Sequence, residues 1–255
     1  MYYILLIVFF IIGTFMGSIY YYVGNRLANH DSLIDPRPHC DNCNHKLSWY
    51  EQIPVLSFII LGGKCKKCRI KLNREYLIYE LLTGILFTST FYLYGFDYKT
   101  IILLILFSLL IMIYITDFKY LIILDIPLII SVIGIIVTLW YQFNYIFVLQ
   151  FILRGIIISL LFLVIKIIGD KVFKQESLGW GDVKLSFIAG LLLGLKLSFV
   201  YIFLGAVLAL PYAIISRVSK NKIRVPFGPF LITSLAIVYL FSSEISNIIN
   251  ILLGV

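Results

Sequence analysis

Long apolar runs occupy most of the chain. A membrane-spanning helix needs about 20 predominantly apolar residues, and eight runs approach that length: Tyr2–Val23, roughly Tyr76–Tyr94, Thr100–Thr116, Leu121–Tyr141, Ile146–Ile168, the shorter Asp182–Leu195, Leu197–Ser216 and Pro226–Phe241. Hydrophobic residues make up 61% of the sequence and the mean hydropathy is +1.01, well above the roughly half-apolar composition of soluble domains. Because the runs lack the alternation of a membrane β-barrel, the sequence predicts an all-α polytopic membrane protein with about eight transmembrane helices.

The polar residues divide the chain into three parts. Residues 1–24 form the first apolar run, which lacks a basic start and a cleavage site of small residues, so we expect a retained helix and not a signal peptide. Gly13 and Gly17 in this run are small enough to let another helix approach closely. Residues 25–75 form a polar stretch that predicts a small cytoplasmic domain, and residues 76–255 carry the remaining seven predicted helices.

The distribution of Lys and Arg predicts the orientation in the bilayer. If residues 25–75 face the cytoplasm, eighteen of the 21 basic residues lie on that side, and Lys99, Arg154 and Lys196 lie outside or within a span. This asymmetry follows the positive-inside rule and places both termini outside. The net charge of +8 is therefore not by itself the footprint of a nucleic-acid-binding protein, and we expect contact with the lipid bilayer and no nucleic-acid partner.

Four cysteines, the full complement of the chain, lie in the cytoplasmic segment as two Cys-x2-Cys pairs, Cys40/Cys43 and Cys65/Cys68. Paired knuckles at this spacing are typical of a tetrahedral four-thiolate zinc site. Four thiolates leave no position for water, so the zinc is expected to be structural in a zinc-ribbon-like domain that is too small to be stable without such a cross-link. An iron–sulfur or redox role and free thiols remain alternatives. His30, His39 and His45 are expected to be solvated.

Two acidic residues stand where the chain enters or leaves apolar runs, Asp117 and Asp182. Two neighbouring carboxyl groups that share a proton can act as general base and general acid on a peptide bond. The alternative is that each acid only ends a helix, since an acid at a helix N-terminus is also a good cap. Gly179 and Gly181 beside Asp182 favour the catalytic hypothesis, because glycine permits close backbone approach.

Three further charged residues have open roles. Asp125 follows Asp117 by eight residues, about two helical turns, and is either a third site residue or a polar helix start before Pro127. Arg154 lies within a predicted span and needs a carboxylate or carbonyl partner. Glu80 lies one turn into the second span, with no partner evident from the sequence.

Taken together, these residues resemble the type IV prepilin leader peptidase/N-methyltransferase family, membrane aspartic endopeptidases with a Gly-x-Gly-Asp motif. The matching motifs are Arg37-x2-Cys40-x2-Cys43-x3-Leu47-x-Trp49-x3-Ile53-Pro54-x2-Ser57, Leu61-x-Gly63-x-Cys65-x2-Cys68-x6-Glu75-Tyr76 with Glu80-Leu81, Asp117 with Leu124-Asp125, Gly179-x-Gly181-Asp182-x-Lys184-Leu185, and Pro226-Phe227-Gly228-Pro229. The chain departs from the family pattern after Gly17-Ser18, where an expected asparagine is missing, and at Leu124, where proline is usual.

The resemblance implies a function for each part of the chain. It implies that Asp117 and Asp182 are the catalytic pair of a peptidase domain, 76–255, and that 25–75 belongs to a methyltransferase region. The implied substrate is a prepilin or pseudopilin, of type IV pili, secretion or competence systems, whose short basic leader is removed on the cytoplasmic side. The implied second reaction methylates the new N-terminal amine with S-adenosylmethionine, for which no binding motif is visible.

Two other classes of protein share some of these features. A transporter or channel with a zinc-stabilised loop would use intramembrane acids as ion or proton relays, but it predicts inverted repeats, which are not evident, and the acids cluster at one face. A membrane-anchored nucleic-acid-binding ribbon would explain the basic loop, yet it leaves both aspartates without a role.

Overall fold

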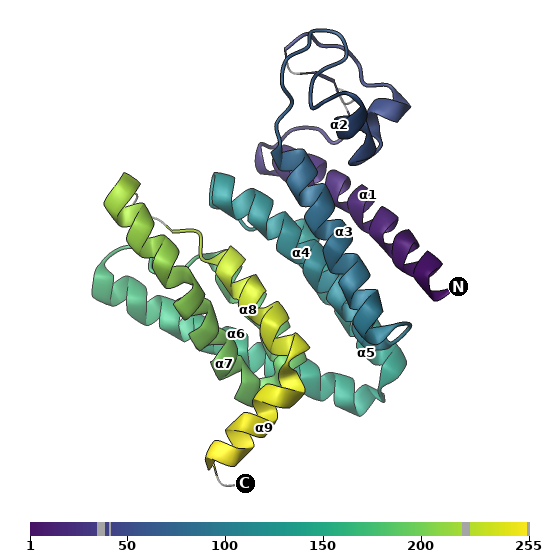
Figure 1. Ribbon diagram of the computed structural model, residues 1–255. Helices are drawn as coiled ribbons and strands as arrows, with labels where there is room; N and C mark the ends of the chain where they lie inside the picture. The colour runs from purple at the N-terminus through teal and green to yellow at the C-terminus, as the bar shows by residue number, and fades with distance from the viewer. Residues whose placement is uncertain (35–38, 41, 221–224, 254–255) are drawn as a thin grey trace. The chain divides into compact units, whose positions relative to one another are not determined.

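The structure is a computed structural model that describes residues 1–34, 39–40, 42–220 and 225–253 (Figure 1). Arg37 of the first motif, and Lys222 and Arg224 of the last basic loop, lie outside the described residues. The described chain is helical: α1 Tyr2–Ala28, η1 Trp49–Gln52 (a 3₁₀ turn), α2 Leu56–Ile60, α3 Glu75–Tyr94, α4 Tyr98–Tyr120, α5 Asp125–Gln142, α6 Tyr145–Phe173, α7 Trp180–Lys220, α8 Gly228–Leu240 and α9 Ser242–Leu253. The predicted all-α class is confirmed.

Six described helices are long and apolar enough to cross a membrane: α1, α3, α4, α5, α6 and α7. A seventh span is possible if α8 and α9, which meet at an 80° bend, are counted together. The two spans predicted on either side of Lys196 are both contained in α7, where Gly194 adopts φ 70° and ψ −178° and interrupts the helical backbone. The protein is thus a multi-pass membrane protein.

Several helices are longer than the apolar runs that predicted them. The run Thr100–Thr116 was expected to end before Asp117, but α4 continues through Tyr120 and ends only where Leu121 adopts a left-handed φ of 56°. Similarly, α6 continues through Gly169 to Phe173. A membrane helix can continue through polar residues beyond the hydrocarbon core, because its backbone hydrogen bonds do not depend on the polarity of the side chains.

The chain divides into two compact units, residues 1–115 and 116–255. In the first unit α1 and α3 lie side by side (Figure 1). A Cβ atom on Gly13 would lie 2.8 Å from the Gly84 Cα, and one on Gly17 would lie 2.7 Å from the Tyr79 carbonyl oxygen. The small residues of α1 therefore permit close helix packing, as predicted.

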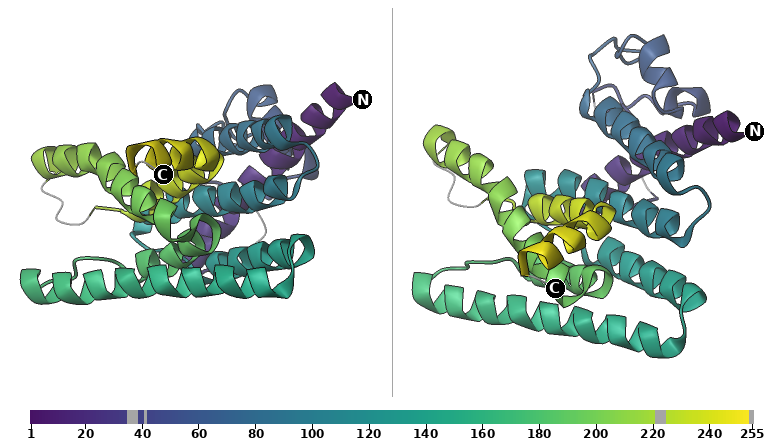
Figure 2. Two further views of the ribbon diagram at one scale, coloured as in Figure 1. Left: turned by 90° about the horizontal axis from the view of Figure 1, so that it is seen from below. Right: turned by 60° about the horizontal axis from the view of Figure 1, so that its bottom comes forward.

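In the second unit α7 packs against both α6 and α8. Figure 2 shows α6 as a long, uninterrupted helix. Gly155 of α6 and Gly190 of α7 let the two backbones approach, since a Cβ on Gly190 would lie 2.6 Å from the Arg154 carbonyl oxygen. On the other side, the buried Ser234 Oγ of α8 donates a 3.0 Å hydrogen bond to the Tyr201 carbonyl oxygen. These contacts fix α7, the helix that carries Asp182.

Candidate active site and metal centre

Asp117 lies in the last turn of α4 and is only 6% exposed. Its Oδ2 accepts a 3.0 Å hydrogen bond from the backbone N–H of Gly228, the first residue of α8. The first N–H groups of a helix have no partner within the helix, and the helix dipole makes this end favourable for an anion. The Pro226-Phe227-Gly228-Pro229 motif therefore builds a helix start that holds the Asp117 carboxyl.

Asp182 lies in the first turn of α7 and is also 6% exposed. Its Oδ2 accepts a 3.2 Å hydrogen bond from the backbone N–H of Gly179, just before the helix. This is the reciprocal half of a capping box, in which an acid in the first turn binds the backbone N–H at the cap position. The capping role raised as an alternative is thus present, and it also fixes the position of the carboxyl group.

The two glycines beside Asp182 are each required for a different structural reason. A Cβ on Gly179 would lie 3.1 Å from Asp182 Oδ2, so this glycine leaves room for the carboxyl group itself. A Cβ on Gly181 would lie 2.6 Å from the Ile123 Cβ, so Gly181 makes room for the segment between α4 and α5. Both glycines permit close approach, as expected, but the approaching groups belong to the protein.

The second unit brings the two acids together from different helices. The carboxyl group of Asp182 interacts electrostatically with that of Asp117, although 65 residues separate them in the chain. Each carboxyl has its own backbone donor, Gly228 for Asp117 and Gly179 for Asp182. Two buried acids that repel each other favour a state in which one of them keeps its proton.

Two residues that the sequence did not single out also act on Asp182. Lys166 of α6 is 4% exposed, and its charge interacts with the Asp182 carboxyl. Tyr201 of α7 is fully buried and interacts electrostatically with Asp182, and its hydroxyl has no hydrogen-bond partner among the described residues. Neither residue belongs to a recognised motif, so sequence position alone did not identify them.

Among the described residues, Asp125 has an ion-pair partner, and Arg154 has an aromatic contact and not the expected carboxylate or carbonyl. Asp125 opens α5, as the polar-helix-start alternative predicted, and it also forms a 2.6 Å ion pair with Lys184 of α7. Both of these side chains are about half exposed, in contrast to the buried pair. The Arg154 guanidinium lies 5.6 Å from the centre of the Phe151 ring, and it is the nearest side chain to the position of a Cβ on Gly194.

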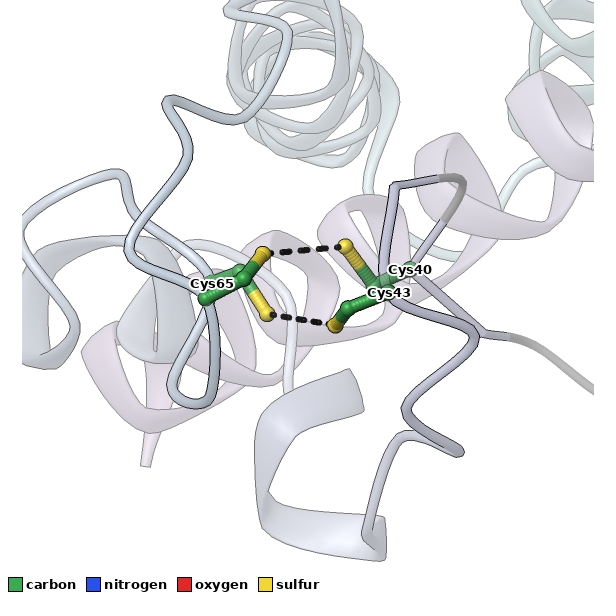
Figure 3. Close-up of side chains that lie close together, drawn as sticks. Cys40, Cys43 and Cys65 are labelled. Atoms are coloured by element: carbon green, nitrogen blue, oxygen red, sulfur yellow. Dashed lines mark hydrogen bonds between the residues drawn. The ribbon is translucent and has the colours of Figure 1, made fainter.

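The four cysteine sulfurs gather in the first unit, where all of them lie within 4.8 Å of one another (Figure 3). The Cys40–Cys68 and Cys43–Cys65 sulfur distances are 3.8 and 3.9 Å. Four sulfurs at about 2.3 Å from a tetrahedral zinc ion would lie about 3.8 Å apart, whereas a disulfide requires about 2.05 Å. The cluster therefore has the spacing of a metal site.

The two cysteine knuckles have the same backbone conformation. The first cysteine of each pair donates to a carbonyl five residues later, Cys40 to His45 and Cys65 to Ile70, both at 2.9 Å. In each knuckle the residue after the second cysteine is left-handed, with φ 53° at Asn44 and 60° at Arg69. Isolated bridges, His39 with Lys46 and Lys64 with Lys71, close both loops. This repetition was not recognised from the sequence.

The protonation of the thiols is consistent with a metal centre. A hydrogen bond from the Ile70 backbone N–H, opposed by burial, lowers the pKa of Cys68 to about 6. The His45 backbone N–H lowers the pKa of Cys43, but burial and the neighbouring sulfurs outweigh it and raise the pKa to about 11. Four crowded sulfurs do not all ionise unless a cation balances their charge.

Two buried carboxylates, one in the polar domain and one in α3, hold loops of the polar domain. Glu80 of α3 accepts a 2.7 Å hydrogen bond from the backbone N–H of Val55, a β-branched residue with the unusual φ of 63°. Glu51 accepts from the Ser48 N–H at 2.7 Å and pairs with His45 at 3.3 Å. Burial would raise the pKa of the Glu51 carboxyl, but these hydrogen bonds outweigh it and lower the pKa. The expectation that His45 is a solvated surface residue is therefore wrong, whereas His30 is exposed, as expected.

The chain thus combines several helices able to span a membrane with two buried carboxyl groups that interact and are held at helix N-termini, as expected of a polytopic membrane protein. The family model described as "Bacterial Peptidase A24 N-terminal domain" matches residues 11–94, which contain the four cysteines. The model described as "Type IV leader peptidase family" matches residues 104–214, which contain Asp117 and Asp182. The chain belongs to the type IV leader peptidase family.

Curated relatives extend this similarity over nearly the whole chain. A Bacillus subtilis protein named "Prepilin leader peptidase/N-methyltransferase" is 30% identical over 94% of this chain and 96% of its own length. A Vibrio cholerae protein of the same name is 28% identical over 91% of this chain and 94% of its own length. One from Myxococcus xanthus is 33% identical over 68% of this chain and 51% of its own length. No solved structure matches the chain.

Proposed function

We propose that this chain is a membrane aspartic endopeptidase that removes the short basic leader from prepilins or pseudopilins, with Asp117 and Asp182 as its catalytic pair. The observation that supports this proposal most is the interaction of two buried carboxyl groups from different helices. Both acids lie inside the region that matches the type IV leader peptidase family, and the relatives named above carry prepilin leader peptidase in their names.

The chemistry follows from one proton shared by the two acids. The ionised carboxyl takes a proton from a water molecule while the oxygen of that water attacks the scissile carbonyl carbon. The protonated carboxyl donates a hydrogen bond to the oxygen of the same carbonyl group. The tetrahedral intermediate then collapses, the C–N bond breaks, and the leaving amine takes a proton from the pair. No covalent enzyme intermediate is needed. The backbone donors Gly228 and Gly179 keep both carboxyl groups oriented throughout.

The orientation proposed for the chain has eight spans and a cytoplasmic site. In this proposal α7, whose helical backbone is interrupted at Gly194, crosses the membrane twice, and α8 together with α9 supplies the last span. With both termini outside, the ends of α4 and α6 and the start of α7 lie on the cytoplasmic side, where the basic residues concentrate. Asp117 and Asp182 then lie at the inner surface of the bilayer, where they reach a substrate helix that enters from the membrane.

The cysteine cluster is proposed to hold one structural zinc ion through Cys40, Cys43, Cys65 and Cys68. The sulfur spacing and the paired knuckles fit this ion, which would cross-link the loops of residues 39–72. The coordination sphere has four protein ligands, so the zinc supplies stability and no catalytic water. A reducing cytoplasm keeps the thiols available for the metal.

Methylation of the new N-terminal amine is proposed as the second activity, with S-adenosylmethionine as donor. The support is the full name of the relatives, which includes N-methyltransferase. No described cluster of residues identifies the site of the methyl donor, and the family asparagine after Gly17-Ser18 is absent here. We therefore assign no residue to this step.

One experiment tests the function as a whole. The purified protein in detergent is incubated with a full-length prepilin and S-adenosylmethionine, and mass spectrometry detects the released leader and the mature product. We expect a shortened product that gains the mass of one methyl group when the methyl donor is present. A prepilin that stays intact under these conditions would overturn the proposal and favour a transporter or channel with a zinc-stabilised loop.

A further inference from the structure

Lys166 is a buried cation in a helix that spans the membrane. It lies on α6, seven residues before the helix ends at Phe173, and is 4% exposed. A buried charge is costly in the low-dielectric interior unless it is paired and hydrogen-bonded. The structure supplies both kinds of partner. Lys166 Nζ donates a 2.7 Å hydrogen bond to the Leu178 carbonyl oxygen and forms a 3.1 Å ion pair with Asp170.

These partners attach the loop between α6 and α7 to one turn of α6. Asp170 accepts two hydrogen bonds from Ser177, from its backbone N–H at 2.6 Å and from its hydroxyl at 2.8 Å. The Ser177 hydroxyl also lies 3.4 Å from the Lys166 carbonyl oxygen. Lys166 and Asp170 thus hold Ser177 and Leu178, the two residues immediately before the Gly179–Asp182 motif.

The same lysine lies close to the motif itself. Its Nζ is 5.3 Å from the centre of the Trp180 ring, and its charge interacts with the Asp182 carboxyl. The other groups that act on Asp182 are the Asp117 carboxyl from α4 and the Tyr201 hydroxyl from the second half of α7. Lys166 is the one cation among these described groups. Lys184 is close in sequence but about half exposed, and it pairs with Asp125.

Building on the proposed function, we propose that Lys166 is a positioning residue of the acid pair with two effects. It holds the loop that presents Asp182, and its positive charge balances the single negative charge of two carboxyl groups that share one proton. A lysine that only anchored the loop would affect geometry alone. A lysine that also balances charge must affect the pH at which the pair loses its proton.

The test compares three variants in the prepilin cleavage assay: Lys166→Met, Lys166→Arg and, as a matched control, Lys171→Met. Methionine keeps most of the lysine stem without its charge, and Lys171 is exposed on the same helix. We expect Lys166→Met to lower kcat about ten- to a hundred-fold, the usual effect of losing a charge-assisted hydrogen bond. KM should change little, and Lys171→Met should behave as the unmodified protein.

The pH profile separates the two effects. An opposite charge favours the ionised form of a carboxyl group. Without the cation, we therefore expect the acidic limb of the kcat profile to move to higher pH by roughly half a unit to one unit. Lys166→Arg should keep the original limb. An unchanged limb in Lys166→Met, or unchanged kcat, would overturn the proposal.

Asp170→Asn provides the second variant if Lys166→Met does not fold. It weakens the loop attachment but leaves the lysine charge, so kcat should fall while the acidic limb stays in place or moves to lower pH. A limb that moves upward would contradict the role assigned to Lys166. Hydrogen exchange of residues 174–181 should increase in both variants whether or not cleavage occurs. This readout distinguishes a failure of the loop assignment from a failure of the proposed peptidase activity, which the unmodified protein reports.

Discussion

The backbone N–H of Gly228 donates a 3.0 Å hydrogen bond to the buried Oδ2 of Asp117, 111 residues earlier in the chain. This bond joins the end of α4 to the start of α8 and gives the Pro226-Phe227-Gly228-Pro229 motif a physical role. Pro229 cannot donate a backbone hydrogen bond, and Gly228 supplies the donor that points at the acid. The motif therefore stabilises the position of one member of the proposed pair.

The role of this bond can be measured with two substitutions at one position. Asp117→Asn and Asp117→Ala both remove the charge, but only asparagine keeps an oxygen that can accept from Gly228. A buried donor without a partner costs about 1–3 kcal/mol. We therefore expect the asparagine variant to be the more stable of the two by that amount, as measured by thermal unfolding in detergent. Equal stability would show that the Gly228 hydrogen bond contributes nothing.

The two glycines of the Gly-x-Gly-Asp motif should differ in their tolerance of alanine. In Gly181→Ala the new Cβ would lie 2.6 Å from the Ile123 Cβ, which cannot rotate away. Overpacking of this kind costs about 1–3 kcal/mol. In Gly179→Ala the nearest atom is the Asp182 carboxyl at 3.1 Å, which can shift by a few tenths of an ångström. Chemical unfolding should show a clear loss for Gly181→Ala and a small one for Gly179→Ala, and the reverse order would be inconsistent with this packing.

The metal site can be tested by thiol titration, because the chain has four cysteines in total and all four belong to the cluster. We expect a thiol reagent to react slowly with the purified protein and to titrate four thiols after a strong chelator is added. Metal analysis before chelation should give about one zinc per chain, and Cys40→Ser should lose it. Four thiols that react freely without a chelator, in protein without bound metal, would contradict the zinc site.

The Glu51 carboxyl predicts a pH dependence for the stability of the cysteine domain. Hydrogen bonds from Ser48 and His45 hold its pKa below the ordinary value of 4.5, so the folded state binds this proton less tightly than the unfolded state. The stabilisation is therefore present above about pH 4.5 and is lost as the pH falls through the lower folded pKa. Glu51→Gln should be less stable than the unmodified protein at pH 7, and the difference should shrink on acidification. A difference that stays constant with pH would exclude this contribution from Glu51.

The sequence predicted the helical class and the clustering of the four cysteines correctly, because the first depends on composition and the second on motif spacing. The electrostatic interaction of Asp182 with Asp117 agrees with the shared membrane face expected for them, and their catalytic role stays a prediction. Helix ends were less accurate. An apolar run indicates only the part of a helix that lies in the hydrocarbon core of the membrane. Both α4 and α6 continue beyond that part and end at a residue with a left-handed backbone conformation, Leu121 or Lys174. The break at Gly194 and the bend between α8 and α9 are local backbone events that hydropathy does not detect.

The residues that support the site were harder to find from the sequence. Lys166 was counted only as one of many cytoplasmic basic residues, because its partners are the backbone carbonyl of Leu178, which lies in a loop, and Asp170, which lies one turn further along α6. Glu80 had no evident partner because it binds the backbone N–H of Val55, which depends on a tertiary contact and a positive φ. Hydrogen bonds to backbone atoms cannot be predicted from the pattern of side chains in the sequence.

The most direct test of the account is the rate of prepilin cleavage by Asp117→Asn, Asp182→Asn and Asp125→Asn, each purified in detergent and compared with the unmodified protein. Asp125 is the matched control, since it is an acid near the same helix ends whose exposed side chain pairs with Lys184. General acid–base groups typically contribute about 10²–10⁴-fold to a rate. We expect each of the first two substitutions to reduce cleavage by at least about 100-fold and Asp125→Asn to retain most of it. Cleavage at the unmodified rate by either Asp117→Asn or Asp182→Asn would contradict a catalytic role for that residue and, with it, the proposed pair.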